Sequence, residues 1–192
     1  MMKRTTPRPV ARLARAMYEE KRELFGLEAA FDRQYFAGLV KRVKSQQHND
    51  QMHLRSMIGS MVDQLNLVWL LRYRFVYHLA PSHTYLLLVP SGRHLGSHQL
   101  LELVQQDTLS QVLEKLPDQL NQQLTDVTTI NAVEVTMEQE LLKQANILLE
   151  RSTFNLGRAF AYMLLREKQL LQIHVALKGK HLRLDNDLVF AA

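Results

Sequence analysis

Residues 63–74, DQLNLVWLLRYR, set Asp63, Asn66, Arg72 and Arg74 within an otherwise largely apolar stretch. At about 100° per residue on a helix, Asp63, Asn66 and Arg74 share one face, while Arg72 points the opposite way. Apolar side chains fill most other directions, which predicts a helix that neighbouring elements cover on several sides. A carboxylate, an amide and a guanidinium buried there need hydrogen-bond or ion-pair partners. Those partners lie either within the fold or on another protein, and the residues alone leave both possibilities open.

Other residues that often carry chemistry do not form a catalytic pattern. The chain has no cysteine, which excludes disulfides and thiolate metal ligands and favours a reducing compartment. His94 and His98 are four residues apart, but Gly96 lies between them in a loop-like segment and no Glu follows the first His. The segment LKGKHL (177–182) has neither the glycine spacing nor the Ser/Thr of a phosphate-binding loop. We therefore expect no enzyme activity, no metal site and no cofactor.

The composition is that of a globular protein. The chain has 192 residues, of which 46% are hydrophobic and 22% charged, enough for one good core or two small repeated units. No uncharged apolar run approaches the roughly 18 residues needed to span a membrane, and the Arg-rich start lacks the apolar core of a signal peptide. These features predict a cytoplasmic location.

Positive charge is concentrated at the start of the chain. Residues 1–44 hold 11 Lys/Arg against 5 Asp/Glu, whereas the remainder holds 13 against 14. Such a segment is either a solvated helix face or the electrostatic footprint of a basic all-α module that binds nucleic acid or another protein. Phe31, Tyr35 and Phe36 fall on an expected helical core stripe, which argues against a base-stacking platform.

Hydrophobic spacing predicts an all-α fold built from long helices. Residues 80–98 are expected to be a loop in which Tyr85–Val89 forms an extended apolar clamp, because no second strand exists to pair with it. Thr108 or Asp107 is expected to cap a short helix. The first predicted helices cover residues 10 to about 26, with Gly26 near the end, residues 31–43, which precede a polar break at 45–50, and residues 52–78. Two or three short helices are expected in residues 97–124. Long helices follow at 131–152 and at 155–178, the latter ending in a turn at 178–180, and a last helix at 187–192 is capped by Asp185 or Asn186.

The two halves of the chain resemble each other at an offset of 106 residues. Residues 63–67 align with residues 169–173, so that Asp63 and Asn66 correspond to two glutamines and Arg72 to Lys178. We therefore predict a flexible segment at 1–9 and two helical repeat units, 10–96 and 97–192, in one continuous structural domain.

Four motifs in order resemble a known family. They are LEAAFDRQYFAGLV, MVDQLNLVWLLRYRF, LVPSGRHL and the closing YMLLREKQLLQIHVALKGK with the short acidic segment LDNDLV after it. Together they resemble the C subunit of the bacterial and archaeal V/A-type rotary ATPases, called the d subunit in eukaryotes. The resemblance covers nearly the whole chain from about residue 20. Two departures are that Gln172 stands where the family prefers Asn, and that His174 stands where Arg is usual.

The resemblance implies a fold and a role. The family folds as three helical-bundle units around a pseudo-threefold axis that together form a funnel. A chain of 192 residues with a repeat of 106 residues has room for about two such units. We therefore expect that the first of the three units is missing. Without it, the chain is expected to self-associate or to expose a hydrophobic patch. The implied role is that of a non-catalytic central-stalk subunit, peripheral on the membrane, which links the rotating stalk to the membrane ring. It would transmit torque for ATP-driven ion transport or ATP synthesis, without binding nucleic acid.

Six polar residues are candidates for contact with partners in this role. The resemblance implies that they either line the funnel cavity or join the repeats to each other. Ion pairs and helix-end hydrogen bonds within the same chain are the alternative for each of them. The six residues are Asp63, Asn66, Arg74, Glu167, Gln172 and Lys178.

Overall fold

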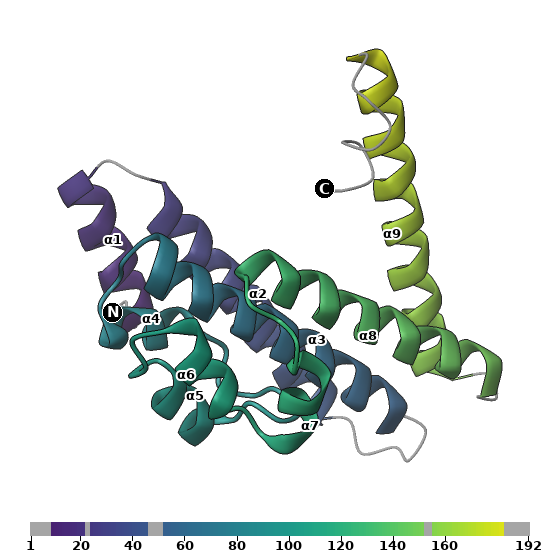
Figure 1. Cartoon of the computed structure of the whole chain (residues 1–192), viewed down its shortest axis with the longest axis horizontal. Coiled ribbons are helices and arrows are strands. Elements are labelled where there is room, and N and C mark those ends of the chain that lie inside the picture. The colour runs from purple at the N-terminus through teal and green to yellow at the C-terminus, as the bar shows by residue number, and fades with distance from the viewer. Residues whose placement is uncertain (1–8, 22–23, 46–51, 152–154, 183–192) are drawn as a thin grey trace, which may run out of the picture.

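The computed structural model describes residues 9–21, 24–45, 52–151 and 155–182, and within these ranges the chain is all-α, as predicted. Two short stretches of other helix type occur, a π-helical turn at Arg72–Val76 and a 3₁₀ turn at Gln122–Leu124. The α-helices of the described ranges (Figure 1) are α1 (Pro9–Lys21), α2 (Phe25–Ser45), α3 (Met52–Leu71), α4 (Pro81–Leu87), α5 (Ser97–Leu103), α6 (Leu109–Glu114), α7 (Asp118–Asn121), α8 (Ile130–Arg151) and α9 (Leu156–His181).

Helix α3 is the central element of the body. It packs against α2, α8 and α9, and the π-helical turn prolongs it to Val76. Its fully buried apolar side chains include Val62, Leu67, Leu70 and Leu71. Coverage on several sides explains why this stretch of sequence is apolar nearly all round.

The short helices α4 to α7 contribute buried side chains to the same hydrophobic cluster as the end of α3, and α4 packs against the π-helical turn. Pro81 begins α4 at a position where its missing N–H costs nothing. The expected extended clamp at Tyr85–Val89 is therefore only partly correct, because α4 continues to Leu87 and the first residue with extended backbone is Leu88. The Thr108 side chain caps α6 by accepting a hydrogen bond from the Gln111 N–H at 3.3 Å. Of the two residues predicted for this cap, Thr108 and Asp107, the structure thus has Thr108.

Three further expectations about the long helices are wrong. Gly26 lies in the first turn of α2 and not near the end of α1; a Cβ there would approach Met17 to 3.0 Å, so glycine permits close packing of the two helices. Phe31 and Tyr35 are exposed on α2 and not part of the core. Residues 178–180 continue α9 and do not form a turn. The predictions for residues 1–8, for most of the polar break and for the helix at 187–192 lie outside the described residues.

Helices α8 and α9 confirm the two long helices predicted for the end of the chain. Asn155 caps α9 by accepting a hydrogen bond from the Arg158 N–H at 2.9 Å. The first turns of α9 pack on α3 and α8, and its later turns extend away from the rest of the body (Figure 1). Between Gln169 and Lys178, every residue except Ala176 is exposed. In the part of the chain that the structure describes, no helix is long and apolar enough to cross a membrane.

Candidate functional site

Asp63 fastens the loop after α4 to the middle of α3. Its Oδ2 accepts hydrogen bonds from the N–H groups of Arg93 at 3.1 Å and His94 at 2.7 Å, and its Oδ1 accepts one from the N–H of Leu95 at 2.9 Å. Burial raises the pKa of Asp63 above its ordinary value, and this outweighs the three N–H donors and the nearby His94, which lower it. The carboxylate therefore serves as an acceptor for three consecutive loop N–H groups, of which that of Arg93 also donates to the Gly59 carbonyl of α3 at 3.2 Å.

Gly92 is required for this contact. A Cβ atom at Gly92 would lie 1.8 Å from Asp63 Oδ1 and 2.9 Å from its Cγ, which is far inside contact distance. The Ser-Gly of the LVPSGRHL motif thus allows the loop backbone to reach the carboxylate.

Asn66 makes a second attachment one helical turn later. Its amide nitrogen donates to the Val89 carbonyl at 2.7 Å, and its amide oxygen accepts from the Val89 N–H at 2.8 Å. The side chain thus bonds both backbone groups of Val89, whose carbonyl also accepts from the Ser91 N–H at 2.8 Å, and the atoms of the two Asn66 hydrogen bonds are buried. We refer to Asp63 and Asn66 with residues 89–95 as the loop clamp.

Arg74, in the π-helical turn, binds the ends of neighbouring segments. Its guanidinium donates to the carbonyls of Leu79 at 2.9 Å, Val104 at 3.0 Å and Gln106 at 3.3 Å, and lies 3.4 Å from the Asp107 carboxylate. The carbonyls of Val104 and Gln106 follow the C-terminus of α5, where a cation is favourable. All the recorded partners of Asp63, Asn66 and Arg74 thus belong to the chain itself.

Glu167, Gln172 and Lys178 lie apart from the loop clamp, on α9. All three side chains are exposed. Glu167 lies beside Lys168, which forms an ion pair with Glu138 of α8 and helps to hold the two helices together. The six candidate residues therefore form two groups, one on α3 and its π-helical extension and one on α9. Whether either group contacts a partner stays a prediction.

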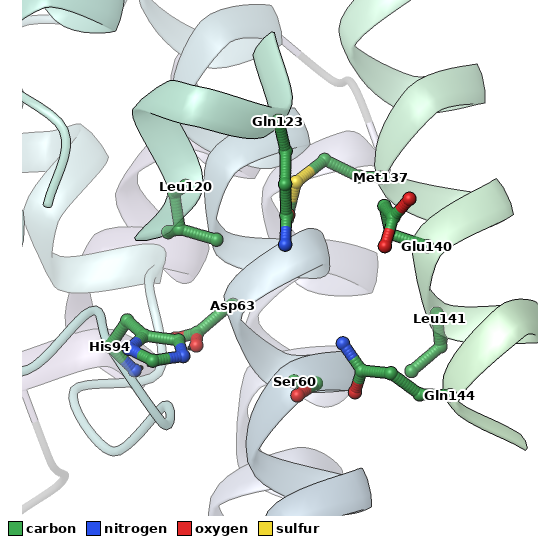
Figure 2. Close-up of a pocket in the computed structure, with 9 residues that line it drawn as sticks. All are labelled: Ser60, Asp63, His94, Leu120, Gln123, Met137, Glu140, Leu141 and Gln144. Atoms are coloured by element: carbon green, nitrogen blue, oxygen red, sulfur yellow. Dashed lines mark hydrogen bonds between the residues drawn. The ribbon is translucent and has the colours of Figure 1, made fainter. Parts of the chain in front are cut away.

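A small polar pocket lies beside the loop clamp (Figure 2). Asp63 and His94 lie near each other on one side, and Glu140 and Gln144 of α8 line the other. Its volume of about 20 Å³ accommodates about one water molecule and no organic substrate. Within the described ranges, no three His, Asp or Glu side chains gather closely enough to hold a metal ion.

A larger apolar groove of about 570 Å³ lies between α2, α3, α8 and α9. Aromatic and aliphatic side chains such as Tyr35, Phe36 and Leu171 form most of its lining. Met163 lines the groove and also belongs to a row of exposed apolar side chains that continues along α9. These side chains are not among the six candidate residues, although their seven-residue spacing is present in the sequence.

Comparison with known proteins decides the family. The family described as ATP synthase (C/AC39) subunit matches residues 1–189. The chain belongs to this family. The resemblance to the C and d subunits of V/A-type ATPases, inferred from four motifs, is thereby confirmed.

One relative within the ATP synthase (C/AC39) subunit family is the C subunit of the A-type ATP synthase of Methanothermobacter thermautotrophicus. It is 26% identical over 171 residues, which are 85% of this chain and 44% of the relative. The chain thus spans less than half the length of the curated relative that it matches. No solved structure matches the chain.

The structure explains two of the motifs that resemble the ATP synthase (C/AC39) subunit family. MVDQLN supplies Asp63 and Asn66, and LVPSGRHL supplies the backbone groups that these side chains bind. The two motifs are therefore halves of the same loop clamp. Their pairing fixes the loop on α3 and needs no ligand.

Proposed function

We propose that this chain is a non-catalytic subunit of a V/A-type rotary ATPase or ATP synthase, which links the rotating central stalk to the membrane ring. In this role it transmits torque and lies at the membrane only through the complex. The match of residues 1–189 to the ATP synthase (C/AC39) subunit family carries the proposal. The name of the Methanothermobacter relative, which makes it the C subunit of an A-type ATP synthase, points in the same direction.

A mechanical role agrees with how the body is held together. A torque-transmitting subunit needs elements that do not shift against each other under load. The loop clamp fixes the α4–α5 loop to α3 through five hydrogen bonds, and Arg74 fixes the end of α5 to the π-helical turn. Interiors packed in this way transmit strain because they have low compressibility.

Packing between the two proposed repeat units also supports this role. Helix α3, from the unit 10–96, packs against α8 and α9 from the unit 97–192. The Arg72–Glu134 ion pair joins the end of α3 to α8. We propose that the two units form one continuous body.

The exposed candidates on α9 are the residues to test for partner contact. Arg74 is unsuitable, because its guanidinium satisfies carbonyls inside the chain and its loss would destabilise the body. We therefore choose a triple variant, Glu167→Lys with Gln172→Ala and Lys178→Glu. These changes invert the charges of the exposed face and leave the net charge unchanged.

The test is capture of the central-stalk subunits and, separately, of the detergent-solubilised membrane ring by the immobilised chain. The chain is expected to capture at least one of the two, and the triple variant is expected to bind about ten-fold more weakly. The matched control exchanges the charges of an exposed ion pair, Glu102→Lys with Lys115→Glu, and is expected to bind as the wild type does.

Two results would contradict the proposal. One is the failure of the chain to bind either the stalk or the ring. The other is salt-sensitive binding to nucleic acid that removal of residues 1–22 abolishes, which would favour a basic binding module.

A further inference from the structure

A pocket with a cationic rim lies where the last turns of α2, the first turns of α3 and the loop after α4 meet. Its volume of about 400 Å³ is in the range of roughly 300–1,000 Å³ that is typical of small-ligand pockets. Lys44 of α2, Arg55 of α3 and Arg93 of the loop line it, together with Ser56 and Ser91. No Asp or Glu is among the described residues of this lining. The pocket, which we call the α2–α3 pocket, therefore complements an anion.

The three cations lack a carboxylate partner in the part of the chain that the structure describes. The Nε of Arg55 donates to the Val43 carbonyl at 3.3 Å, and the Nη1 of Arg93 lies 3.5 Å from the Ser60 Oγ. No ion pair among the described residues includes either arginine or Lys44. All three residues are exposed, so their charged ends are accessible from solvent. Gathered like charges of this kind are favourable only with an anion or solvent between them.

The fold holds one side of this pocket in place. The Arg93 N–H donates to the Gly59 carbonyl at 3.2 Å and to Asp63 Oδ2 at 3.1 Å. A Cβ at Gly59 would lie 2.9 Å from the Cβ of Arg93, so the glycine lets the loop lie directly on α3. The loop clamp thus fixes where the Arg93 side chain begins. A cation whose backbone is already positioned loses less conformational freedom when it binds a ligand.

The floor of the α2–α3 pocket is aliphatic. Its buried side chains are Val40, Val43 and Ile58. Met52, which is 65% exposed, lies at its edge. Arg93 also lines a neighbouring hollow of about 320 Å³ that reaches Ile147 and Leu148 of α8. Apolar surface beneath a cationic rim fits a molecule with an anionic head and an apolar chain, whereas the described lining has no aromatic side chain on which a nucleic-acid base could stack.

We propose that the α2–α3 pocket binds one molecule of an anionic phospholipid. The phosphate of its head contacts Lys44, Arg55 and Arg93, since guanidinium and ammonium groups form charge-assisted hydrogen bonds with phosphate oxygens. The acyl chains lie on the aliphatic floor, where they cover apolar surface that otherwise faces water. This site lies on α2, α3 and the loop after α4, and it does not depend on the rotary role.

The test compares three probes that separate the head from the chains. They are dihexanoyl phosphatidic acid, dihexanoyl phosphatidylcholine, which has the same chains and a zwitterionic head, and glycerol 3-phosphate, which has the phosphate and no chains. Isothermal titration calorimetry with the full chain measures binding of each, with the lipids below the concentration at which they form micelles. Phosphatidic acid is expected to bind at least about ten-fold more tightly than either of the other two.

Variants of the chain locate the binding surface. The pair Lys44→Gln with Arg93→Gln is expected to weaken phosphatidic acid binding by about ten-fold. Met52→Gln is expected to weaken it by about three-fold, because an apolar contact with the chains is lost. The matched control, Lys178→Gln with Lys180→Gln, also removes two positive charges from exposed positions and is expected to bind normally. Circular dichroism of each variant checks that the helical content is retained.

Several results would overturn the inference. They are no binding of phosphatidic acid, equal binding of phosphatidic acid and either other probe, and binding that the Lys44 and Arg93 variant leaves intact. Weaker binding by the Lys178 and Lys180 variant alone would assign the lipid to α9. A single-stranded oligonucleotide that binds more tightly than phosphatidic acid and displaces it would assign the cations to nucleic acid. The proposed function could fail in the stalk and ring capture while this inference stands, since the lipid assay contains neither partner.

Discussion

Replacing Gly92 by alanine tests the physical basis of the loop clamp. The added Cβ would lie 1.8 Å from Asp63 Oδ1, so the carboxylate has to leave its place between the N–H groups of residues 93–95. Gly92 has no positive φ, so alanine can adopt the same backbone conformation and the cost is steric. The variant therefore isolates one contact, that between residue 92 and the carboxylate.

The magnitude follows from the groups that lose a partner. The hydrogen bond to the Leu95 N–H is buried, and an unsatisfied buried donor costs about 1–3 kcal/mol. The bonds to Arg93 and His94 are only partly buried, so water can replace them at a smaller cost. We expect Gly92→Ala to lower the free energy of unfolding by about 3 kcal/mol. Asp63→Ala should cost about 2 kcal/mol, because removing the carboxylate also removes the penalty for burying its charge.

The decisive quantity is the coupling between the two substitutions. With Asp63→Ala already in place, the methyl group of Ala at position 92 no longer meets the carboxylate, and its nearest remaining contact is the Leu95 carbonyl oxygen at 3.1 Å. In that background we expect Gly92→Ala to cost less than about 1 kcal/mol, which gives a coupling energy of about 2 kcal/mol.

Urea unfolding of the four proteins, followed by circular dichroism at neutral pH, measures this coupling. Gly38→Ala is the matched control, since a Cβ at this helical position of α2 meets nothing within 4 Å. That control should stabilise the protein by about 0.5–1 kcal/mol. Additive effects of Gly92→Ala and Asp63→Ala, within about 0.5 kcal/mol, would refute the steric argument.

Three further predictions concern the same buried polar groups. Because burial raises the pKa of Asp63 above 3.8, the folded state holds its proton more tightly, and the resulting stabilisation is lost as pH rises from 3.8 through the raised pKa. Asp63→Asn should remove this slope from the free energy of unfolding measured across that window. Asn66→Asp should lower that free energy by about 2–4 kcal/mol at neutral pH, since a carboxylate would face the Val89 carbonyl; urea unfolding of this variant measures the loss. Arg74→Lys should cost about 1–3 kcal/mol in the same assay, because one ammonium group cannot reproduce the planar fork that donates to Leu79 and Val104.

The sequence was sufficient to locate the central helix and the polar face on it. A stretch that is apolar on nearly every side has to be covered, and α3 is the most enclosed helix of the body. Helical geometry placed Asp63, Asn66 and Arg74 on one face before any partner was known. The partners could not be predicted, because they are backbone groups of a loop, and every residue carries such groups.

Tertiary contacts decided where the sequence analysis was wrong. The run Tyr85–Val89 is aromatic and aliphatic, which suits an extended segment. However, Pro81 begins a helix that continues to Leu87 and so includes the first three residues of this run. The spacing of Phe31 and Tyr35 fits a helical stripe, yet both side chains are exposed, whereas Ala29, Val40 and Val43 of the same helix are buried. Periodicity thus gave the helix, and the position of the neighbouring element decided which part of the stripe is core.

The placement of the six candidate residues also determines which variants can report on assembly. Asp63, Asn66 and Arg74 use their polar groups on the chain's own backbone, so a substitution there alters folding whether or not a partner binds. A loss of capture by Arg74→Glu would therefore be ambiguous, since an unfolded chain also fails to bind. Substitutions on the exposed face of α9 disturb no buried group, and the free energy of unfolding should change by less than about 0.5 kcal/mol. Loss of binding with unchanged stability is consequently the combination that assigns α9 a partner, and the face of α3 cannot provide it.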